Sequence, residues 1–381
     1  MNQAQAAMEE KINPRRFSSL FRDRWLVAAA VGAVVAIVTA ILTATIFAPK
    51  RSVGPRAPGF VLRDQQGRLT SLAEFRGKVV VLTFIDPYCQ QICPLTTESM
   101  VEALRLLGPA AATRVQLLGI DANPLKTQVS DVAAYTRAHG LEGRWRFLTG
   151  TRAELERVWH GYHVYVAAAA GDIDHEAVVF LIDGKGRERK IYSTPMSYGA
   201  VGPQAETMAE GIAALLPSHP AVLRDASLEQ QASPLEPADT ASLPALGKGQ
   251  RQVVLGGARP RLVLFFAGWL GESTNLPERL AALDAYGAQA RRHGWPMPVA
   301  VDELTTEPSR AAARELLAPI AAKLQTPIVE DADGRLADGY QVEDLPWYVL
   351  TSRTGKILWR HDGWLSTAVL GQRVRAALRG N

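Results

Sequence analysis

Apolar and polar residues alternate along residues 57–216 in blocks that predict strands and helices in turn. Val79 to Ile85 is an apolar run of strand length, and Val115 to Ile120 is a second, mostly apolar one. Between them, Leu95 to Leu107 has apolar residues at helical spacing. A hairpin pattern follows at residues 178–192 around a glycine-containing turn. This order predicts an α/β fold with a mixed sheet that helices cover on both faces.

The same order of elements returns in residues 251–381. A strand pattern at Leu262 to Ala267 precedes a helical pattern at Pro277 to His293, and a hairpin pattern at residues 347–360 follows. Such an internal repeat predicts a second domain of the same class. Residues 217–250 lie between the two and contain proline, serine and alanine without a clear period. This composition predicts an extended, mobile linker.

The N-terminal part contains a long apolar run, Trp25 to Ala48, without a charged side chain. A helix of roughly 20 apolar residues crosses a hydrocarbon core, so residues 25–48 are predicted to be a transmembrane signal anchor. Basic residues are more frequent before this run than after it, which predicts that residues 1–24 are cytoplasmic. The expected location is therefore the cell inner membrane, crossed once, with both domains on the periplasmic, extracytoplasmic side.

A cleaved signal peptide is the alternative reading of the same run. Its apolar part is too long for one, and the acidic residues Glu9, Glu10 and Asp23 precede it. The signal anchor is therefore the better interpretation. It places the folded domains in an oxidising space, where an idle pair of thiols tends to form a disulfide.

The overall charge adds little to this picture. The chain has 381 residues and a formal net charge of +4, with 47% hydrophobic residues. Its basic residues are spread along the chain and form no patch with interleaved aromatic residues. No nucleic-acid partner is therefore expected.

The two cysteines of the chain lie together as Cys89-Gln90-Gln91-Ile92-Cys93-Pro94, directly after the first strand pattern. A spacing of four residues puts both sulfurs on one face of a helical turn. There they can close a disulfide or offer two thiolates to one soft metal ion. The start of a helix also lowers a thiol pKa, so both are candidates for thiolates at neutral pH. A purely structural disulfide is the weaker reading, because so short a loop constrains the unfolded chain little.

A third participant at this site is predicted to be His175. Counting back from Gly186 in the first hairpin and from Gly355 in the second aligns Ala177 with Pro346. A thioredoxin carries a cis-proline at that position, packed against its cysteine pair. The loop that holds His175 should therefore face the cysteines. Two thiolates and one imidazole suit Cu(I), and Cu(II) is possible with an added ligand.

These motifs together resemble the Sco (SenC) family of thioredoxin-like proteins involved in cytochrome c oxidase assembly. The resemblance covers about residues 57–216. The residues that carry it are Ala57-Pro58-Gly59-Phe60, Cys89 to Pro94, Leu148-Thr149-Gly150 and Asp174-His175. The chain departs from the family pattern at Asp86-Pro87-Tyr88 and at Glu176-Ala177, and neither departure removes a ligand.

The resemblance implies that Cys89, Cys93 and His175 bind copper. It also implies a role in cytochrome c oxidase assembly, with oxidase subunit II or another assembly protein as partner. In that role the protein delivers copper to the binuclear CuA site, or keeps the cysteines of that site reduced. The expected function is that of a membrane-anchored copper metallochaperone.

Two enzymatic functions are the alternatives. In a thiol–disulfide oxidoreductase, Cys89 and Cys93 act as a redox pair and His175 is not needed. A peroxidase of the peroxiredoxin type is disfavoured, because Gln90 stands where that chemistry needs a Thr or Ser hydroxyl three residues before Cys93. The metallochaperone differs from both in its need for His175.

The second domain has lost the corresponding chemistry. Trp269 to Ser273 falls where a thioredoxin has its WCGPC motif, with Leu270 and Ser273 in place of the cysteines. Pro346 keeps the proline of that scaffold and is a candidate for a cis peptide bond. The domain resembles a redox-inactive thioredoxin or TlpA-like domain, so docking or a structural role is expected.

Three other histidines receive simpler interpretations. His139 precedes Gly140 and is expected at a helix C-terminus, where a cation is favoured. His160 and His163 lie near another predicted helix end. No His-rich or Met-rich tract supports a second copper site.

Overall fold

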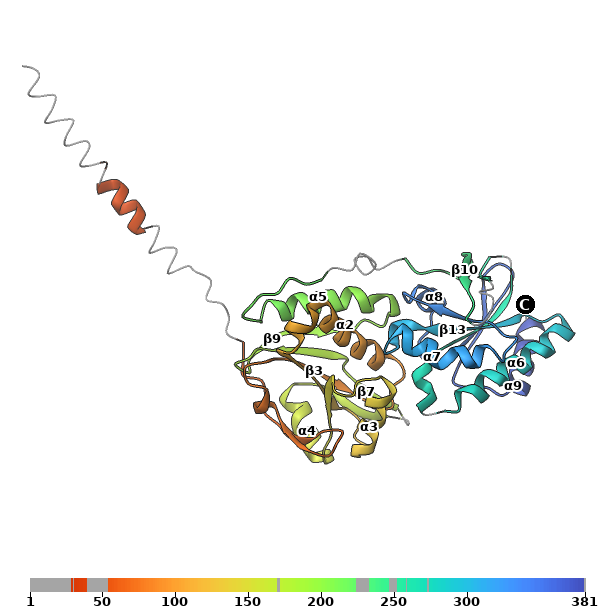
Figure 1. The fold of residues 1–381 in the computed structure, drawn as a ribbon, viewed down its shortest axis with the longest axis horizontal. Helices are drawn as coiled ribbons and strands as arrows, with labels where there is room; N and C mark the ends of the chain where they lie inside the picture. Colours follow the sequence, from red (N-terminus) through yellow and green to blue (C-terminus); the bar gives the residue numbers. More distant parts are fainter. Residues whose placement is uncertain are drawn as a thin grey trace, which may run out of the picture. The chain divides into compact units, whose positions relative to one another are not determined.

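The computed structural model of the protein divides into two compact units, residues 1–53 and residues 54–381. Figure 1 shows its elements in sequence colours. The residues that the structure describes are 29, 31–39, 54–169, 172–223, 233–246, 252–257, 259–272 and 274–379.

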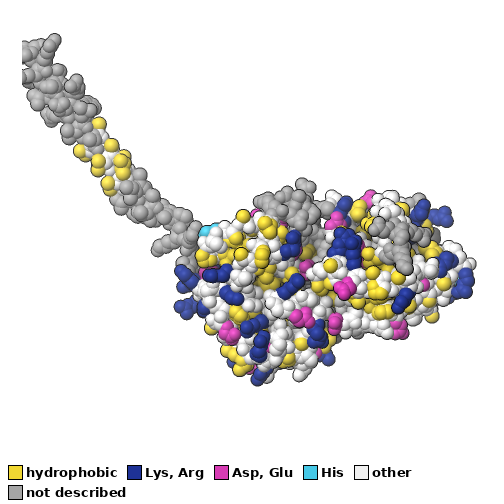
Figure 2. Space-filling model, in the orientation of Figure 1, with side chains coloured by type: hydrophobic (Ala, Val, Ile, Leu, Met, Phe, Trp, Pro, Cys, Tyr) yellow, Lys and Arg dark blue, Asp and Glu magenta, His cyan; other side chains and the backbone are white. Residues whose placement is uncertain are grey.

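In the first unit, residues 31–39 are helical. Their apolar side chains are exposed, among them Val34 and Ile37, and Figure 2 shows them in yellow on the surface of the segment. Most of the predicted signal anchor, residues 25–48, lies outside the described residues, as does all of residues 1–24. Within the part that the structure describes, no helix is both long and apolar enough to span a membrane. The anchor therefore stays a prediction.

The second unit contains a first five-stranded sheet with the order β5-β4-β3-β8-β9. Its strands are β3 (Val79–Ile85), β4 (Val115–Asp121), β5 (Trp145–Leu148), β8 (Val178–Ile182) and β9 (Glu188–Ser193). The central strand β3 pairs in parallel with β4 and antiparallel with β8. The mixed α/β sheet predicted from the apolar runs is therefore confirmed.

Helices cover both faces of this sheet. The alternation of side chains along β3 sends Val79 and Val81 into one core and Val80 and Leu82 into the other. The first core also contains residues of α2 (Ile92–Ala112), α3 (Val129–Ala138) and α5 (Val201–Ala213). The second core contains residues of η1 (Leu72–Phe75) and α4 (Arg152–Gly161). Two hairpins, β1 (Val61–Arg63) with β2 (Leu69–Ser71) and β6 (Val166–Ala169) with β7 (Asp172–His175), complete this half.

A second five-stranded sheet repeats the same order as β14-β13-β12-β15-β16. Its strands are β12 (Arg261–Phe266), β13 (Met297–Glu303), β14 (Ile328–Asp331), β15 (Trp347–Thr351) and β16 (Ile357–Asp362). Its helical elements are η3 (Gly268–Glu272), α6 (Leu276–His293), η4 (Leu304–Thr306), α7 (Arg310–Ala321), α8 (Arg335–Gly339) and α9 (Thr367–Arg379). The Leu345–Pro346 peptide bond is cis. The repeated element order and the cis bond confirm two predictions, whereas the resemblance to redox-inactive thioredoxins stays a prediction.

Part of the segment predicted as a linker is ordered on the second sheet. Residues Ala241–Pro244 form β10, which pairs antiparallel with β11 (Gln252–Leu255). Leu246 N donates a hydrogen bond to Ile328 O at 2.8 Å, beside the edge strand β14. The expectation of a mobile linker is therefore wrong for these residues, because an exposed sheet edge offers backbone groups for pairing. Residues 224–232 and 247–251 lie outside the described part.

A carboxylate of the second half caps a short helix of the first. The Asp338 carboxylate accepts hydrogen bonds from Ser197 Oγ at 2.8 Å, Tyr198 N at 2.8 Å and Gly199 N at 3.1 Å. These residues lie at the start of η2 (Tyr198–Ala200), where backbone N–H groups have no helical partner. Tyr198 and Leu95 are buried in the same apolar cluster as the core of the second sheet. The two halves are thus held together by polar capping and by apolar burial.

His139 also lies where the two halves meet. It is the C-cap of α3, as the sequence predicted, but it is only 6% exposed. Its ring packs against Tyr135 and Trp269, with centroids 4.2 Å and 4.7 Å away. Burial lowers the pKa of His139 to about 3. The expectation of a cation at this helix end is therefore wrong, because desolvation outweighs the helix dipole.

Candidate functional site

The two cysteines lie at the connection between β3 and α2. Cys89 is in the connecting turn, and its N–H donates to Asp86 O at 3.1 Å. Cys93 is in the first turn of α2, which begins at Ile92, and is 1% exposed. Both thiols are free. The expectation that both sulfurs lie on one helical turn is therefore wrong, because the helix begins after Cys89.

The two thiols differ in acidity. A hydrogen bond with the Cys93 thiol is the largest influence that lowers the pKa of Cys89. Burial raises the pKa of Cys93 well above its ordinary value, and the neighbouring Cys89 raises it further. At neutral pH, Cys93 therefore holds its proton, and Cys89 is the more acidic of the two. The prediction of two thiolates is corrected on this point, because desolvation of Cys93 outweighs the helix N-terminus.

His175 lies against the buried cysteine. It ends the strand β7, so a hairpin stands where the sequence predicted a loop. Its Nε2 is 3.6 Å from Cys93 Sγ, and its Nδ1 is 3.2 Å from Glu176 O. Strand β8 starts directly after Ala177, just as β15 starts after Pro346. The aligned hairpins therefore bring His175 to the cysteines, as the register predicted.

The hydrogen bond to Glu176 decides the state of the imidazole ring. A carbonyl oxygen can only accept, so Nδ1 carries the proton and Nε2 has a free lone pair. Burial also lowers the pKa of His175, which favours the neutral ring. The lone pair thus faces the Cys93 sulfur, as it must for a metal ligand.

The donor set suits a soft metal ion. Cys93 Sγ lies 3.6 Å from His175 Nε2, and the Cys93 thiol is also the largest influence on the lowered pKa of Cys89. Two sulfurs and an imidazole nitrogen are the ligand types that Cu(I) prefers. As they stand, however, no three His, Cys, Asp or Glu side chains of the described residues are arranged around one point to hold a metal.

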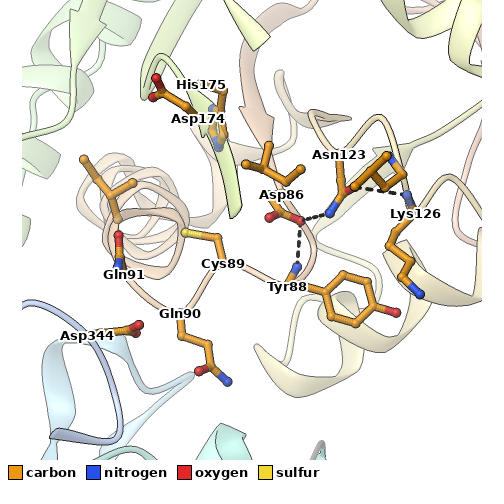
Figure 3. Close-up of a pocket in the computed structure, with 13 residues that line it drawn as sticks. Asp86, Tyr88, Cys89, Gln90, Gln91, Asn123, Lys126, Asp174, His175 and Asp344 are labelled. Carbon is orange, nitrogen blue, oxygen red and sulfur yellow. Dashed lines mark hydrogen bonds between the residues drawn. The ribbon is translucent and has the colours of Figure 1, made fainter. Parts of the chain in front are cut away.

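A pocket of 510 Å³ opens over Cys89 and His175. Figure 3 shows the carboxylates of Asp174 and Asp344 on its walls. Asp344 comes from the second half of the chain and was not predicted as a site residue. It stands two residues before Pro346, and no pattern in the sequence links it to the cysteines of the first half.

The unusual residues before the first cysteine shape the other side of this pocket. Asp86 Oδ1 accepts hydrogen bonds from Asn123 Nδ2 at 2.8 Å and from Tyr88 N at 3.0 Å. The Tyr88 hydroxyl donates to Asp131 Oδ1 at 2.9 Å, and its ring is exposed. Asp86 thus fixes the turn that carries Cys89, which gives this departure from the family pattern a structural role.

Asp121 is a buried acid behind this network. Its Oδ1 accepts from Asn123 N at 2.9 Å and its Oδ2 from Thr149 Oγ1 at 2.8 Å. The residue is 0% exposed, and burial raises its pKa to about 8. The folded protein therefore keeps a proton on Asp121 at a pH where the unfolded chain has lost it.

This proton makes stability fall as pH rises. The unfolded carboxyl ionises near its ordinary pKa of 3.8, whereas the folded one ionises near 8, so the folded state binds more protons between these values. From about pH 6 to about pH 7.5, we expect the free energy of unfolding to fall by about 2 kcal/mol on account of Asp121. Urea unfolding of the protein and of Asp121→Asn at both pH values checks this. An equal slope in the variant would contradict the assignment.

The remaining predicted residues lie elsewhere. His160 and His163 line a separate pocket beside Trp159 and Tyr165, and neither lines the pocket over Cys89. In the second half, Leu270 is fully buried at the position of a lost cysteine. Ser273 lies outside the described residues.

Comparison with known proteins bears on the first half of the chain. Residues 50–212 match the family model described as SCO1/SenC. The mitochondrial SCO2 homolog of Bos taurus is 31% identical over 145 residues, which are 36% of this chain and 54% of the relative. The Homo sapiens SCO2 homolog is 30% identical over 134 residues, or 33% of this chain and 50% of the relative. The chain thus spans about half the length of these curated relatives.

Solved structures show a weaker likeness. The copper-bound ScoI of Bradyrhizobium japonicum has a TM-score of 0.37 and 24% identity, covering 42% of this chain and 100% of that one. The copper-bound ScoI of Arabidopsis thaliana has a TM-score of 0.37 and 22% identity, covering 42% and 98%. The family resemblance predicted from the motifs is confirmed by the family model and the curated relatives, and it applies to residues 50–212.

Proposed function

We propose that the protein is a Sco-type metallochaperone that carries one copper ion as its cargo. Cys89, Cys93 and His175 would hold the ion. The observation that carries this proposal is the contact between His175 Nε2 and Cys93 Sγ, together with the hydrogen bond that fixes the proton on Nδ1. A histidine held in this tautomer presents its lone pair to the thiol, which a thiol–disulfide enzyme does not require.

The cellular role follows from the family resemblance. The protein would be anchored in the inner membrane by residues 25–48, with both domains in the periplasm. Its recipient would be the CuA site of cytochrome c oxidase subunit II, or another oxidase assembly protein. The match of residues 50–212 to the SCO1/SenC family model supports this assignment.

A thiol–disulfide oxidoreductase is the second candidate. The different acidities of Cys89 and Cys93 favour it, because an exchange enzyme uses one acidic, accessible thiol and one buried resolving thiol. In this role, Cys89 and Cys93 would reduce a partner disulfide and become oxidised to a disulfide themselves. His175 would then be dispensable.

Replacement of His175 separates the two functions. We expect the reduced protein to bind one Cu(I) per chain, and His175→Ala to weaken this binding at least about tenfold, since one of three ligands is lost. The Cys89–Cys93 disulfide should still form in the variant. His160→Ala is the matched control, because His160 lines a different pocket. A competition titration with a Cu(I) chelator measures the affinity, and equal affinities of His175→Ala and wild type would contradict the three-ligand site.

A further inference from the structure

The second half of the chain supplies one wall of the thiol pocket. Asp344 lines this pocket together with Cys89, Gln90 and Gln91. In Figure 3 its carboxylate lies on the side of Gln90 and Gln91, across from Lys126. Asp344 lies in the bend that leads through Leu345 and cis-Pro346 into β15, which begins at Trp347.

The contacts beside the pocket hold this wall in place. Leu95, two residues after Cys93, is 1% exposed and belongs to the apolar core of the second sheet. The Asp338 carboxylate caps η2 through three hydrogen bonds. Gly334 approaches Tyr198 so closely that a Cβ atom there would lie 2.4 Å from the Tyr198 carbonyl carbon. Packing this tight fixes Asp344 relative to the cysteine turn.

Charge is what Asp344 adds to the pocket. The other charged side chains that line it are Asp86, Asp174 and Lys126. Without Asp344, two carboxylates face one ammonium group. With it, the lining has three carboxylates against one cation, so the potential over Cys89 is more negative.

We propose that Asp344 is a specificity-determining residue of the thiol pocket, which favours cationic reactants at Cys89 and repels anionic ones. A copper cation would be attracted to the site. Anionic small thiols and disulfides, the class to which glutathione belongs, would be repelled from the same sulfur. The second domain would thereby protect the thiols from the soluble thiol pool while it leaves them open to the metal. This inference rests on the proposed function only in taking Cys89 as the reactive thiol.

Alkylation of the reduced, copper-free full chain tests the charge effect. The Cys89 thiolate attacks the CH₂ group of iodoacetate or iodoacetamide, a sulfur–carbon bond forms, and iodide leaves. The two reagents differ by one negative charge, so the ratio of their rates reports the local potential, and a change in the thiol pKa cancels. We expect Asp344→Asn to raise the iodoacetate-to-iodoacetamide ratio about threefold to tenfold at low ionic strength. The difference should shrink in high salt.

Glu343→Gln is the matched control. Glu343 is the exposed neighbour of Asp344 and does not line the pocket, so its loss should leave the ratio near the wild-type value. An unchanged ratio in Asp344→Asn would overturn the proposal. A rise of both rates by the same factor leaves the ratio unchanged and would overturn it as well, since such a result indicates a steric opening or a changed thiol pKa and no discrimination by charge. Because no copper is present, failure of this test is distinct from failure of the copper site.

Discussion

Replacing Cys93 with serine is expected to abolish tight copper binding. Cys93 Sγ lies 3.6 Å from His175 Nε2, and its thiol is the largest influence that lowers the pKa of Cys89, so Cys93 is central to the proposed ligand set. A hydroxyl is a poor ligand for Cu(I), and the loss of one thiolate also removes a negative charge that stabilises the bound cation. We expect the Cu(I) affinity to fall on the order of a thousandfold, equivalent to roughly 4 kcal/mol.

The fold should survive this change, because oxygen and sulfur differ little in size and the His175 ring remains as a hydrogen-bond acceptor. Copper competition titrations measure the affinity, and thermal unfolding of the metal-free protein serves as the control. Retention of near wild-type affinity in a folded Cys93→Ser protein would place the copper elsewhere. Cys89→Ser should bind copper weakly too, since the proposed site needs both sulfurs.

The second large effect is expected where the two halves of the chain meet. Tyr198 is 1% exposed and packs in the core of the second sheet, although it comes from η2 beside the first. Tyr198→Ala would leave a cavity the size of the ring, and we expect the free energy of unfolding to fall by about 3–5 kcal/mol. Urea unfolding of the copper-free protein measures the change.

Tyr198→Phe provides the matched control. The Tyr198 hydroxyl is buried without a hydrogen-bond partner among the described residues. Its removal should therefore be neutral or slightly stabilising, because an unsatisfied buried polar group is costly. If Tyr198→Ala were as stable as Tyr198→Phe, apolar packing of this ring would not be what joins the halves.

The sheets and the position of His175 could be predicted from local sequence. Mostly apolar runs such as Val79 to Ile85 are typical of strands buried on both faces, and β3 is such a strand. The turn glycines Gly186 and Gly355 fix the register of their hairpins, because an antiparallel pair is set by its turn. That register was sufficient to bring His175 from a distant part of the sequence to Cys93.

Burial and long-range packing could not be predicted in the same way. The spacing of Cys93 indicates a helix start and hence a low pKa, but only the fold shows that desolvation raises it. The prediction of a charged His139 is wrong for the same reason, since Trp269 from the other half of the chain covers its ring. Asp344 was missed because no local pattern links it to Cys89, which precedes it by more than half of the chain.

We propose above all that Cys89, Cys93 and His175 together bind one copper ion. X-ray absorption at the copper edge of the Cu(I)-loaded protein tests this most directly, because it counts the ligand atoms around the metal. We expect two sulfur scatterers and one imidazole nitrogen, with the nitrogen signal lost in His175→Ala and kept in His160→Ala. Copper bound by two sulfurs alone, or an imidazole signal that persists in His175→Ala, would contradict it.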